Sequence, residues 1–328
     1  MDKAVDAGHA EAYLPASAPE AITGERRSEG ARGDPAANRT RDVRPTVRVR
    51  REMTTPGAAL CGGNGTRGGD LDRQREPLPT RVDSLPDLPV AFDDALDAAL
   101  VGLGVDLGPT VRGTIRDHVR LLLAWNEAIN LTAITDPAAV AILHVADSLA
   151  ALALMRGAPP ARLLDLGSGG GFPGLTLAAA LPGTHVTLVE SVAKKARFLA
   201  AAAAAIGLAD RVPVLATRAE ALGTGEERGR ARWDIVTARA VGGLGDLVEL
   251  ALPLLSVGGR LLAWKRGPIT AELEAGARAA AALGGDPPVL VPTVLPELRE
   301  HVIVVVRKRE ATPPGYPRDP AARRRRPW

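Results

Sequence analysis

Aromatic side chains are scarce in this chain of 328 residues, where they make up 3% of the total. Because 46% of the residues are nevertheless hydrophobic, a core can form, and we expect it to consist mainly of Ala, Leu and Val. The one cysteine, Cys61, excludes an internal disulfide and fits a reducing compartment. The few histidines show no metal-ligand spacing, so we expect no bound metal.

Long apolar segments are also scarce. The longest apolar run that we identify, Phe198–Leu208, is too short to span a bilayer. Asp2 and Asp6 stand where a secretory signal peptide would be basic. We therefore expect a soluble, cytoplasmic protein without a membrane partner.

The two ends of the chain differ in composition from its middle. Residues 1–87 are rich in Gly, Pro and charged side chains without apolar periodicity, so we predict a disordered extension. A start of translation farther downstream, for example at Met53, is an alternative. Residues 311–328 are predicted to form an extended basic tail. Its run of four consecutive arginines, which need solvent or a counter-charge such as a phosphate backbone, comprises Arg323, Arg324, Arg325 and Arg326.

Regular structure is expected over residues 88–310. Apolar side chains at helical spacing predict a small helical segment over residues 88–158, in which Asp136 and Pro137 mark the start of a helix that ends near Met155. The predicted strands are Arg162–Leu166, His185–Val189, Val212–Leu215, Asp234–Thr237, Arg260–Trp264, Val289–Leu295 and Val302–Arg307. The predicted helices between them are Leu175–Leu181, Val192–Ile206, Leu244–Leu255 and Ala271–Leu283.

This alternation predicts an α/β fold, a mostly parallel sheet with helices on both faces. The last two predicted strands follow each other across residues 296–300 without a helix, which indicates a closing hairpin. An antiparallel strand that closes a parallel sheet is typical of the methyltransferase version of the Rossmann-like fold. In such sheets ligands bind at the carboxyl ends of the strands.

A glycine-rich loop follows the first predicted strand within Leu163–Leu175. The order of apolar run, glycine loop and helix predicts a nucleotide-like ligand close to the backbone N–H groups of the helix start. Gly169, Gly171 and Gly174 fit the G-x-G-x-x-G spacing of dinucleotide sites, so a nicotinamide-dependent oxidoreductase is one alternative.

Three further features together favour S-adenosylmethionine. Asp165 ends the first strand with a carboxylate that could meet an ammonium group, although a helix-capping role is its alternative. Glu190 ends the second strand, where it could accept hydrogen bonds from both ribose hydroxyls. Residues 217–220 follow the third strand, where a backbone N–H and a carboxylate could bind the adenine edge.

Several short segments resemble one family, and they occur in its order from about Ala91 onward. The segments are Trp125–Thr132, His144–Ser148, the glycine loop with Phe172–Gly174, Val189–Ser191, Lys194–Leu199, Arg218–Glu220, Thr237–Ala240, Trp264–Gly267 and Tyr316–Arg318. They resemble the bacterial small-subunit (16S) ribosomal RNA guanine-N7 methyltransferases, the glucose-inhibited division protein B family. The resemblance implies a Rossmann-like class I methyltransferase that uses S-adenosylmethionine on 16S ribosomal RNA.

The resemblance also implies cofactor contacts. It implies them at Gly167, Phe172, Ala219, Glu220 and Arg239; our reasoning from the residues adds Asp165, Gly169 and Glu190. Candidate contacts with RNA are the basic residues near the predicted cleft and in the tail, namely Lys194, Lys195, Arg197, Lys265, Arg266 and Arg323–Arg326. A solvated basic face is the alternative for the first three of these.

His144, Asp147 and Ser148 lie within five residues, so we interpret them as a polar cluster that faces the cleft or fixes the helical segment, not as a hydrolase triad. Purine N7 carries a free lone pair, so methyl transfer to it requires no general base, and we assign no catalytic residue. We expect a monomer that acts on a small ribosomal subunit or its precursor. A small-molecule methyltransferase and a non-catalytic RNA-binding assembly factor are the alternatives.

Overall fold

The computed structural model describes residues 78–155, 159–224 and 230–328, which all belong to one compact unit. Its helical first part comprises α1 (Val90–Leu103), α2 (Pro109–Asn126), α3 (Pro137–Val140), η1 (Ala141–Ala146), α4 (Asp147–Leu149) and η2 (Ala150–Met155). The elements that follow are β1 (Arg162–Leu166), α5 (Gly174–Ala180), β2 (His185–Val189), α6 (Ala193–Ala205), β3 (Val214–Leu215), α7 (Ala219–Thr224), β4 (Trp233–Arg239), α8 (Leu244–Ala251), β5 (Leu255–Arg266), α9 (Thr270–Leu283), β6 (Val289–Pro292), η3 (Pro296–Leu298), β7 (His301–Arg307) and α10 (Pro320–Arg325).

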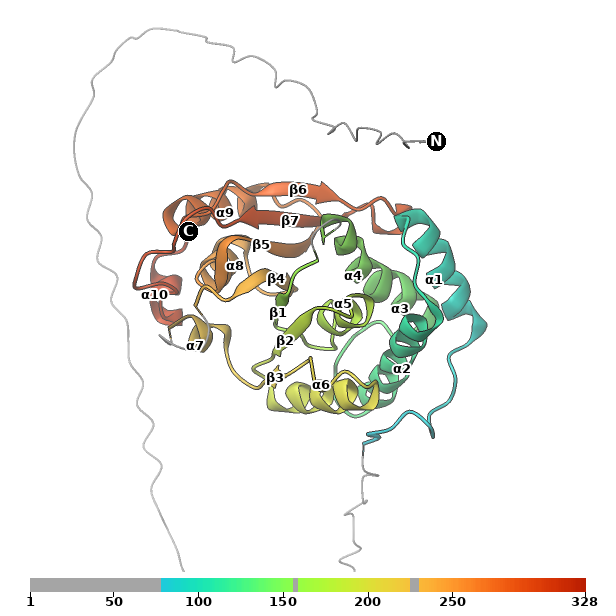
Figure 1. Cartoon of the computed structure of the whole chain (residues 1–328). Helices are drawn as coiled ribbons and strands as arrows, with labels where there is room; N and C mark the ends of the chain where they lie inside the picture. The colour runs from blue at the N-terminus through green and yellow to red at the C-terminus, as the bar shows by residue number, and fades with distance from the viewer. Residues whose placement is uncertain (1–77, 156–158, 225–229) are drawn as a thin grey trace, which may run out of the picture. The chain divides into compact units, whose positions relative to one another are not determined.

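The sheet has seven strands in the order β3-β2-β1-β4-β5-β7-β6 (Figure 1). Strands β1 to β5 are parallel, and β7 is antiparallel to both β5 and β6. This arrangement confirms the predicted mostly parallel sheet and its antiparallel closing strand. The carboxyl ends of β1 to β5 therefore meet at one edge, which we call the carboxyl edge.

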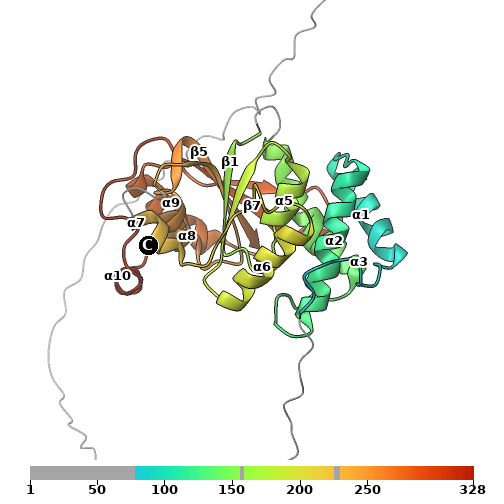
Figure 2. The same ribbon diagram turned by 60° about the horizontal axis from the view of Figure 1, so that its bottom comes forward.

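Helices cover both faces of this sheet, as Figures 1 and 2 show: α5 and α6 lie on one face with the helical first part, and α8 and α9 lie on the other. Successive strand residues point to opposite faces, so Leu163 joins the core under α5 and α6 while Leu164 joins the core under α8 and α9. Burial on both faces explains why three of the five residues of β1 are leucines.

The helical first part shares its core with the sheet. Phe198 of α6 is fully buried, and its ring lies 5.5 Å from that of Trp125 and 6.3 Å from that of His118, both in α2. Trp125 also donates from Nε1 to the carbonyl oxygen of Pro79 at 2.6 Å. Residues 78–87 are thus ordered and packed, which corrects the prediction of disorder for this part of residues 1–87; residues 1–77 lie outside the described residues.

The helical run 137–155 is continuous but not uniformly α-helical. Asp136 caps it as predicted, since its Oδ2 accepts a hydrogen bond from the N–H of Ala139 at 2.8 Å. Residues 141–146 then form a π-helix, a variant that is frequent at functional sites. By length and composition this run could cross a membrane. The sequence did not reveal it as a long apolar run because His144, Asp147 and Ser148 interrupt it. Its apolar residues Val140, Val145 and Leu149 are fully buried, as in a core helix.

Two predicted elements have wrong boundaries where an apolar run hides a turn. Helix α8 ends at Ala251 and β5 already begins at Leu255, whereas we predicted a helix to Leu255 and a strand from Arg260. Leu252 and Leu254 are buried in the connecting turn, so their apolar character cannot distinguish this turn from a helix.

The prediction of an extended tail is also wrong, because residues 311–328 fold back and contain helix α10, which Asp319 caps.

Phe198→Ala is expected to lower the free energy of unfolding by about 3–5 kcal/mol, because it removes the ring that joins α6 to α2 and leaves a cavity. Val101→Ala is the control, since Val101 is 83% exposed on α1 and its truncation should change stability by less than about 0.5 kcal/mol. Urea unfolding followed by tryptophan fluorescence measures both. A loss below about 1 kcal/mol for Phe198→Ala would show that the helical first part is only loosely attached.

Candidate active site

The carboxyl edge brings together residues that are far apart in the sequence. Arranged along it are Gly167 and Gly169 after β1, Glu190 after β2, Ala219 and Glu220 after β3, Arg239 at the end of β4, and Lys265 and Arg266 at the end of β5. These residues all lie at the carboxyl edge because β1 to β5 are parallel and adjacent in the sheet.

The glycine loop follows a path that only glycine follows without strain. Gly167, Gly169 and Gly171 have φ angles of +71°, +53° and +91°. The N–H of Gly169 donates to Oε2 of Glu190 at 3.0 Å, and the N–H of Val192 donates to Oε1 of the same carboxylate at 2.8 Å. Backbone donors thus fix the Glu190 side chain next to the loop.

Asp165 lies in the core at the end of β1. Its side chain is fully buried beneath the loop, and its Oδ1 accepts a hydrogen bond from the hydroxyl of Thr237 in β4 at 2.8 Å. Its Oδ2 has no hydrogen-bond partner among the residues that the structure describes. Burial raises the pKa of Asp165 from 3.8 to about 6. Asp165 thus joins β1 to β4, and its contact with an ammonium group stays a prediction.

Phe172 lies between two histidines of the helical first part. Its ring centroid is 4.8 Å from that of His144 and 4.7 Å from that of His118, and the guanidinium carbon of Arg239 lies 5.4 Å from the ring. Burial lowers the pKa of His118 to about 4, and burial together with the charge of Arg239 lowers the pKa of His144 to about 3. Both imidazoles are therefore neutral near pH 7.

Arg239 is largely buried and is held from several sides. Its Nη1 donates to Oδ2 of Asp147 at 3.4 Å and to the carbonyl oxygen of Leu143 at 3.2 Å, while Nη2 donates to Nδ1 of His144 at 3.1 Å. On the other side of the ring, Nε2 of His144 lies 2.7 Å from the hydroxyl of Thr132. The hydrogen-bond partners of Arg239, which is on the sheet, thus come from the helical first part.

Asp147 connects this cation to the closing strands. Its Oδ1 accepts a hydrogen bond from Nδ1 of His301 in β7 at 3.1 Å, and its carbonyl oxygen accepts one from Nε1 of Trp264 in β5 at 2.9 Å. The expected polar cluster around His144 and Asp147 is present. His301 was missed, because it lies 154 residues from Asp147 and carries no motif of its own.

A cavity of about 460 Å³ opens beside this network, and we call it the polar cavity because titratable side chains form part of its wall. Its wall contains apolar, acidic and basic side chains, which are Leu131, Ile134, Leu143, His144, Asp147, Arg239, Ala240, Trp264, Lys265, Arg266 and His301. It lies at the ends of β4 and β5, so it is next to the glycine loop along the carboxyl edge. A cavity with this lining can bind an aromatic base and a nearby phosphate.

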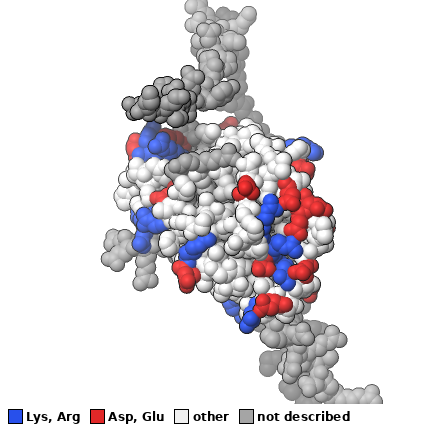
Figure 3. Space-filling model, turned by 45° about the vertical axis from the view of Figure 1, so that its right-hand side comes forward, with Lys and Arg blue, Asp and Glu red and all other residues white. Residues whose placement is uncertain are grey.

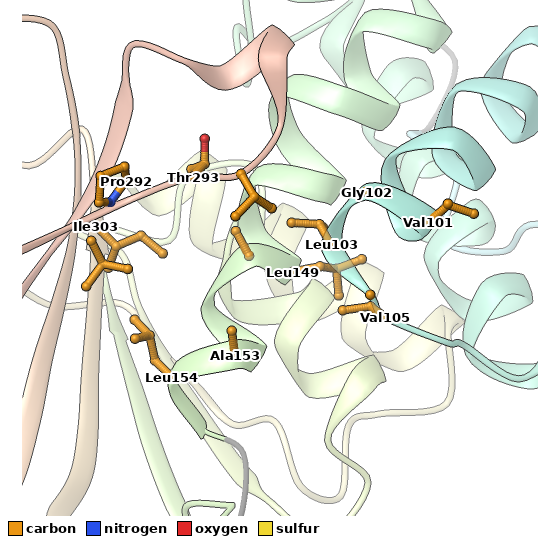
Figure 4. A pocket seen from close by; sticks show the side chains of 14 residues that line it. Val101, Gly102, Leu103, Val105, Leu149, Ala153, Leu154, Pro292, Thr293 and Ile303 are labelled. Carbon is orange, nitrogen blue, oxygen red and sulfur yellow. The ribbon is translucent and has the colours of Figure 1, made fainter. Parts of the chain in front are cut away.

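A second cavity, of about 490 Å³, lies between the end of α1, the helical run 147–155 and β6 (Figure 4). The side chains that Figure 4 labels there are almost all apolar, for example Val105, Leu149 and Ile303. Its lining includes no titratable side chain. It therefore cannot take part in charge or proton chemistry, and we assign the candidate active site to the carboxyl edge.

The candidate RNA contacts differ in how free they are. Lys194, Arg197 and Arg266 are exposed, and Lys195 is half-buried. Lys265 is bound, because its Nζ donates to Glu272 at 2.5 Å and to the carbonyl oxygen of Gly242 at 2.8 Å.

Of the four consecutive arginines in the tail, Arg324, Arg325 and Arg326 are exposed. Arg323 is buried and pairs with Glu220, so the prediction that it contacts RNA is wrong.

The face formed by the helical first part has mixed charge. Figure 3 shows Lys and Arg side chains interspersed with Asp and Glu on the side that there comes forward. Ion pairs between α1 and α2, Arg112 with Asp97 and Arg116 with Asp93, account for part of this pattern. Such a face offers no extended positive potential to a phosphate backbone.

Asp165→Asn is expected to remove a pH dependence of stability. Because its pKa is raised, folded Asp165 binds a proton more tightly than the unfolded chain does, so this residue makes the wild type less stable as pH rises from about 4 to about 6. The stability of Asp165→Asn relative to the wild type should grow by about 2–2.5 kcal/mol between about pH 4 and pH 7. Urea unfolding across this pH range measures the difference in unfolding free energy between the two proteins, and a difference independent of pH would contradict the raised pKa of Asp165.

The family model and the curated relatives agree on one family. Residues 113–300 match the family model GidB, described as rRNA small subunit methyltransferase G. The chain is similar to Ribosomal RNA small subunit methyltransferase G of Roseiflexus castenholzii, with 46% identity over 197 residues, 60% of this chain and 83% of that protein. It is also 42% identical over 246 residues to the protein of the same name from Sorangium cellulosum, covering 74% and 98% of the two chains.

Among solved structures, the chain is similar to a T. thermophilus 16S rRNA N2 G1207 methyltransferase in complex with AdoMet and guanosine. That likeness has a TM-score of 0.35 and 21% identity, and covers 47% of this chain and 36% of that one. The family model and the curated relatives lead to one conclusion: the chain belongs to the GidB family, the small-subunit ribosomal RNA methyltransferases G.

Proposed function

We propose that this protein transfers a methyl group from S-adenosylmethionine to N7 of a guanine in 16S ribosomal RNA, within a small ribosomal subunit or its precursor. Family membership supports the reaction class. The observation that carries the proposal is the juxtaposition, along the carboxyl edge, of a glycine loop with a fixed carboxylate and a polar cavity large enough for a base.

The loop and its neighbours suit the cofactor, which supplies an electrophilic methyl group when bound. Gly167 and Gly169 let the ligand approach the backbone, and the carboxylate of Glu190, which two backbone N–H groups hold in place, would accept hydrogen bonds from ribose hydroxyls. Ala219 and Glu220 begin α7 and would meet the adenine. Arg239 lines the polar cavity and the Phe172 ring packs against Arg239, so the methionine part and the target base would come together there.

The polar cavity suits a guanine. Trp264 supplies a flat wall for a base, and His301, which donates from Nδ1 to Asp147, lies in the same wall, where its ring could form a hydrogen bond with an edge of the base. The neutral His144 adds no positive charge where the purine gains one. N7 attacks through its own lone pair, so the chain contributes alignment, which can supply roughly 7–11 kcal/mol of a barrier.

Access to N7 requires an exposed base. In an RNA helix N7 faces the deep, narrow major groove, so the substrate guanine is in a loop or flipped out. The exposed Lys194, Arg197 and Arg266 flank the carboxyl edge and would contact phosphates. Because contacts with phosphates do not depend on the base sequence, recognition of the target guanine would depend on the shape of the ribosomal particle.

The reaction itself is tested with cofactor labelled on its methyl group and small subunits that lack the modification. We expect label in 16S RNA and 7-methylguanosine after digestion to nucleosides. A protein that binds the cofactor but labels neither subunits nor their precursors would contradict the proposal and favour a small-molecule methyltransferase or a non-catalytic assembly factor.

Gly167→Ala is expected to weaken cofactor binding by at least roughly tenfold, because a side chain at positive φ costs about 1–3 kcal/mol and forces the loop to move. At Gly167 the added Cβ would lie 2.6 Å from Cγ2 of Val241. Gly183→Ala is the matched control, since its Cβ would meet nothing within 4 Å. Calorimetric titration measures both variants, and equal affinities would show that the loop does not hold the cofactor.

Arg266→Ala is expected to weaken binding to small subunits and to reduce the slope of log K against log salt by about 1. Arg309→Ala is the control, because Arg266 and Arg309 are 72% and 65% exposed and each pairs with a glutamate. Arg309 follows β7, which runs antiparallel, so it lies at the opposite edge of the sheet. Filter binding over a range of salt concentrations measures the slopes, and an equal slope for both variants would place the RNA elsewhere.

A further inference from the structure

The C-terminal residues 311–328 are anchored on α8 by a buried acid. Glu249 of α8 is fully buried, and it accepts hydrogen bonds at 2.6 Å from the backbone N–H and from Nη2 of Arg318. Nε1 of Trp328 donates to the same carboxylate at 2.6 Å, and the Arg318 guanidinium lies 4.7 Å over the Trp328 ring. Burial alone would raise the pKa of Glu249, but these hydrogen bonds outweigh it and lower the pKa, so the anchor is charged.

This anchor directs one of four consecutive arginines inward. Asp319 caps α10 by accepting hydrogen bonds from the N–H groups of Ala321 and Ala322 at 2.8 and 2.9 Å. The side chain of Arg323 is only 9% exposed, and its Nη1 donates to the carbonyl oxygen of Arg318 at 3.1 Å. Its Nη2 donates to Oε1 of Glu220.

Glu220 is the second residue of α7, directly after the loop that follows β3. Burial alone would raise its pKa, but the hydrogen bond from Arg323 contributes to a net lowering, so the carboxylate stays charged. A carboxylate that is already fixed loses less conformational entropy when a ligand binds next to it. Arg323 itself lies outside residues 113–300, which the family model matches.

We infer that Arg323 is a positioning residue of the cofactor site, which orients Glu220 and the first turn of α7 for the adenosine part of the cofactor. Helix α10 is then a part of the site and not a tail for RNA. The inference rests on the proposed function in one respect, namely that adenosine binds next to Ala219 and Glu220.

The test compares adjacent arginines of the same charge. Arg323→Ala should weaken the binding of S-adenosylhomocysteine roughly tenfold in calorimetry, whereas Arg324→Ala, which removes an exposed charge, should change it by less than about twofold. Arg323→Lys keeps a cation and should recover part of the loss. Circular dichroism and urea unfolding verify that each variant is folded. In the methyl-transfer assay, Arg323→Ala should raise KM for the cofactor and leave kcat unchanged.

A double-mutant cycle shows whether Arg323 acts through Glu220. In the Glu220→Gln background, Arg323→Ala should weaken binding by less than about twofold further, since its partner is already altered. An equal loss in both backgrounds, or wild-type affinity of Arg323→Ala, would overturn the inference.

Because this binding test contains no RNA, its outcome is separate from that of methyl transfer. A wild type that binds the cofactor but does not methylate subunits refutes the proposed function and leaves this inference standing. A wild type that does not bind the cofactor overturns both.

Discussion

A guanidinium that is only 19% exposed at the end of β4 determines how the site is assembled. Arginine cannot lose its proton in a protein, so Arg239 must find a counter-charge and acceptors where it is buried. It finds Asp147, the carbonyl oxygen of Leu143 and Nδ1 of His144 in the helical run, and the face of Phe172 in the glycine loop. One cation thereby joins the sheet, the loop and the helices that precede both.

This requirement explains why the helical first part belongs to the enzyme's centre. Asp147 also accepts from His301 and Trp264, so the same carboxylate connects the closing strands to the helical run. The polar cavity lies among these elements, which means that its shape depends on their relative placement. On the other side of the site, the C-terminal segment has a similar role: a buried acid, Glu249, anchors it, and Arg323 reaches Glu220. Both ends of the folded chain therefore support the carboxyl edge.

Local patterns predicted what local chemistry determines. Strands β1 and β2 have the predicted bounds, because each is a largely buried segment that ends abruptly at a glycine or an acidic residue. The boundary between α8 and β5 could not be found this way, since the buried leucines of the turn look like a continued helix.

Side-chain partners could not be predicted where they are distant in sequence. Arg323 and Glu220 are 103 residues apart, and four identical arginines in a row carry no mark of which one faces inward. For the same reason the partner of Asp165 was unforeseen. Its position at the end of β1 follows from sequence, but the hydroxyl of Thr237 that binds it is on β4.

A crystal structure of the protein with S-adenosylhomocysteine and guanosine would test most directly the claim that the carboxyl edge holds two adjacent sites. We expect the adenosine over the glycine loop, between Glu190 and Glu220, and the guanine in the polar cavity beside Arg239, Trp264 and His301. Adenosine bound in that polar cavity, or guanine bound in the apolar cavity beside β6, would contradict the account.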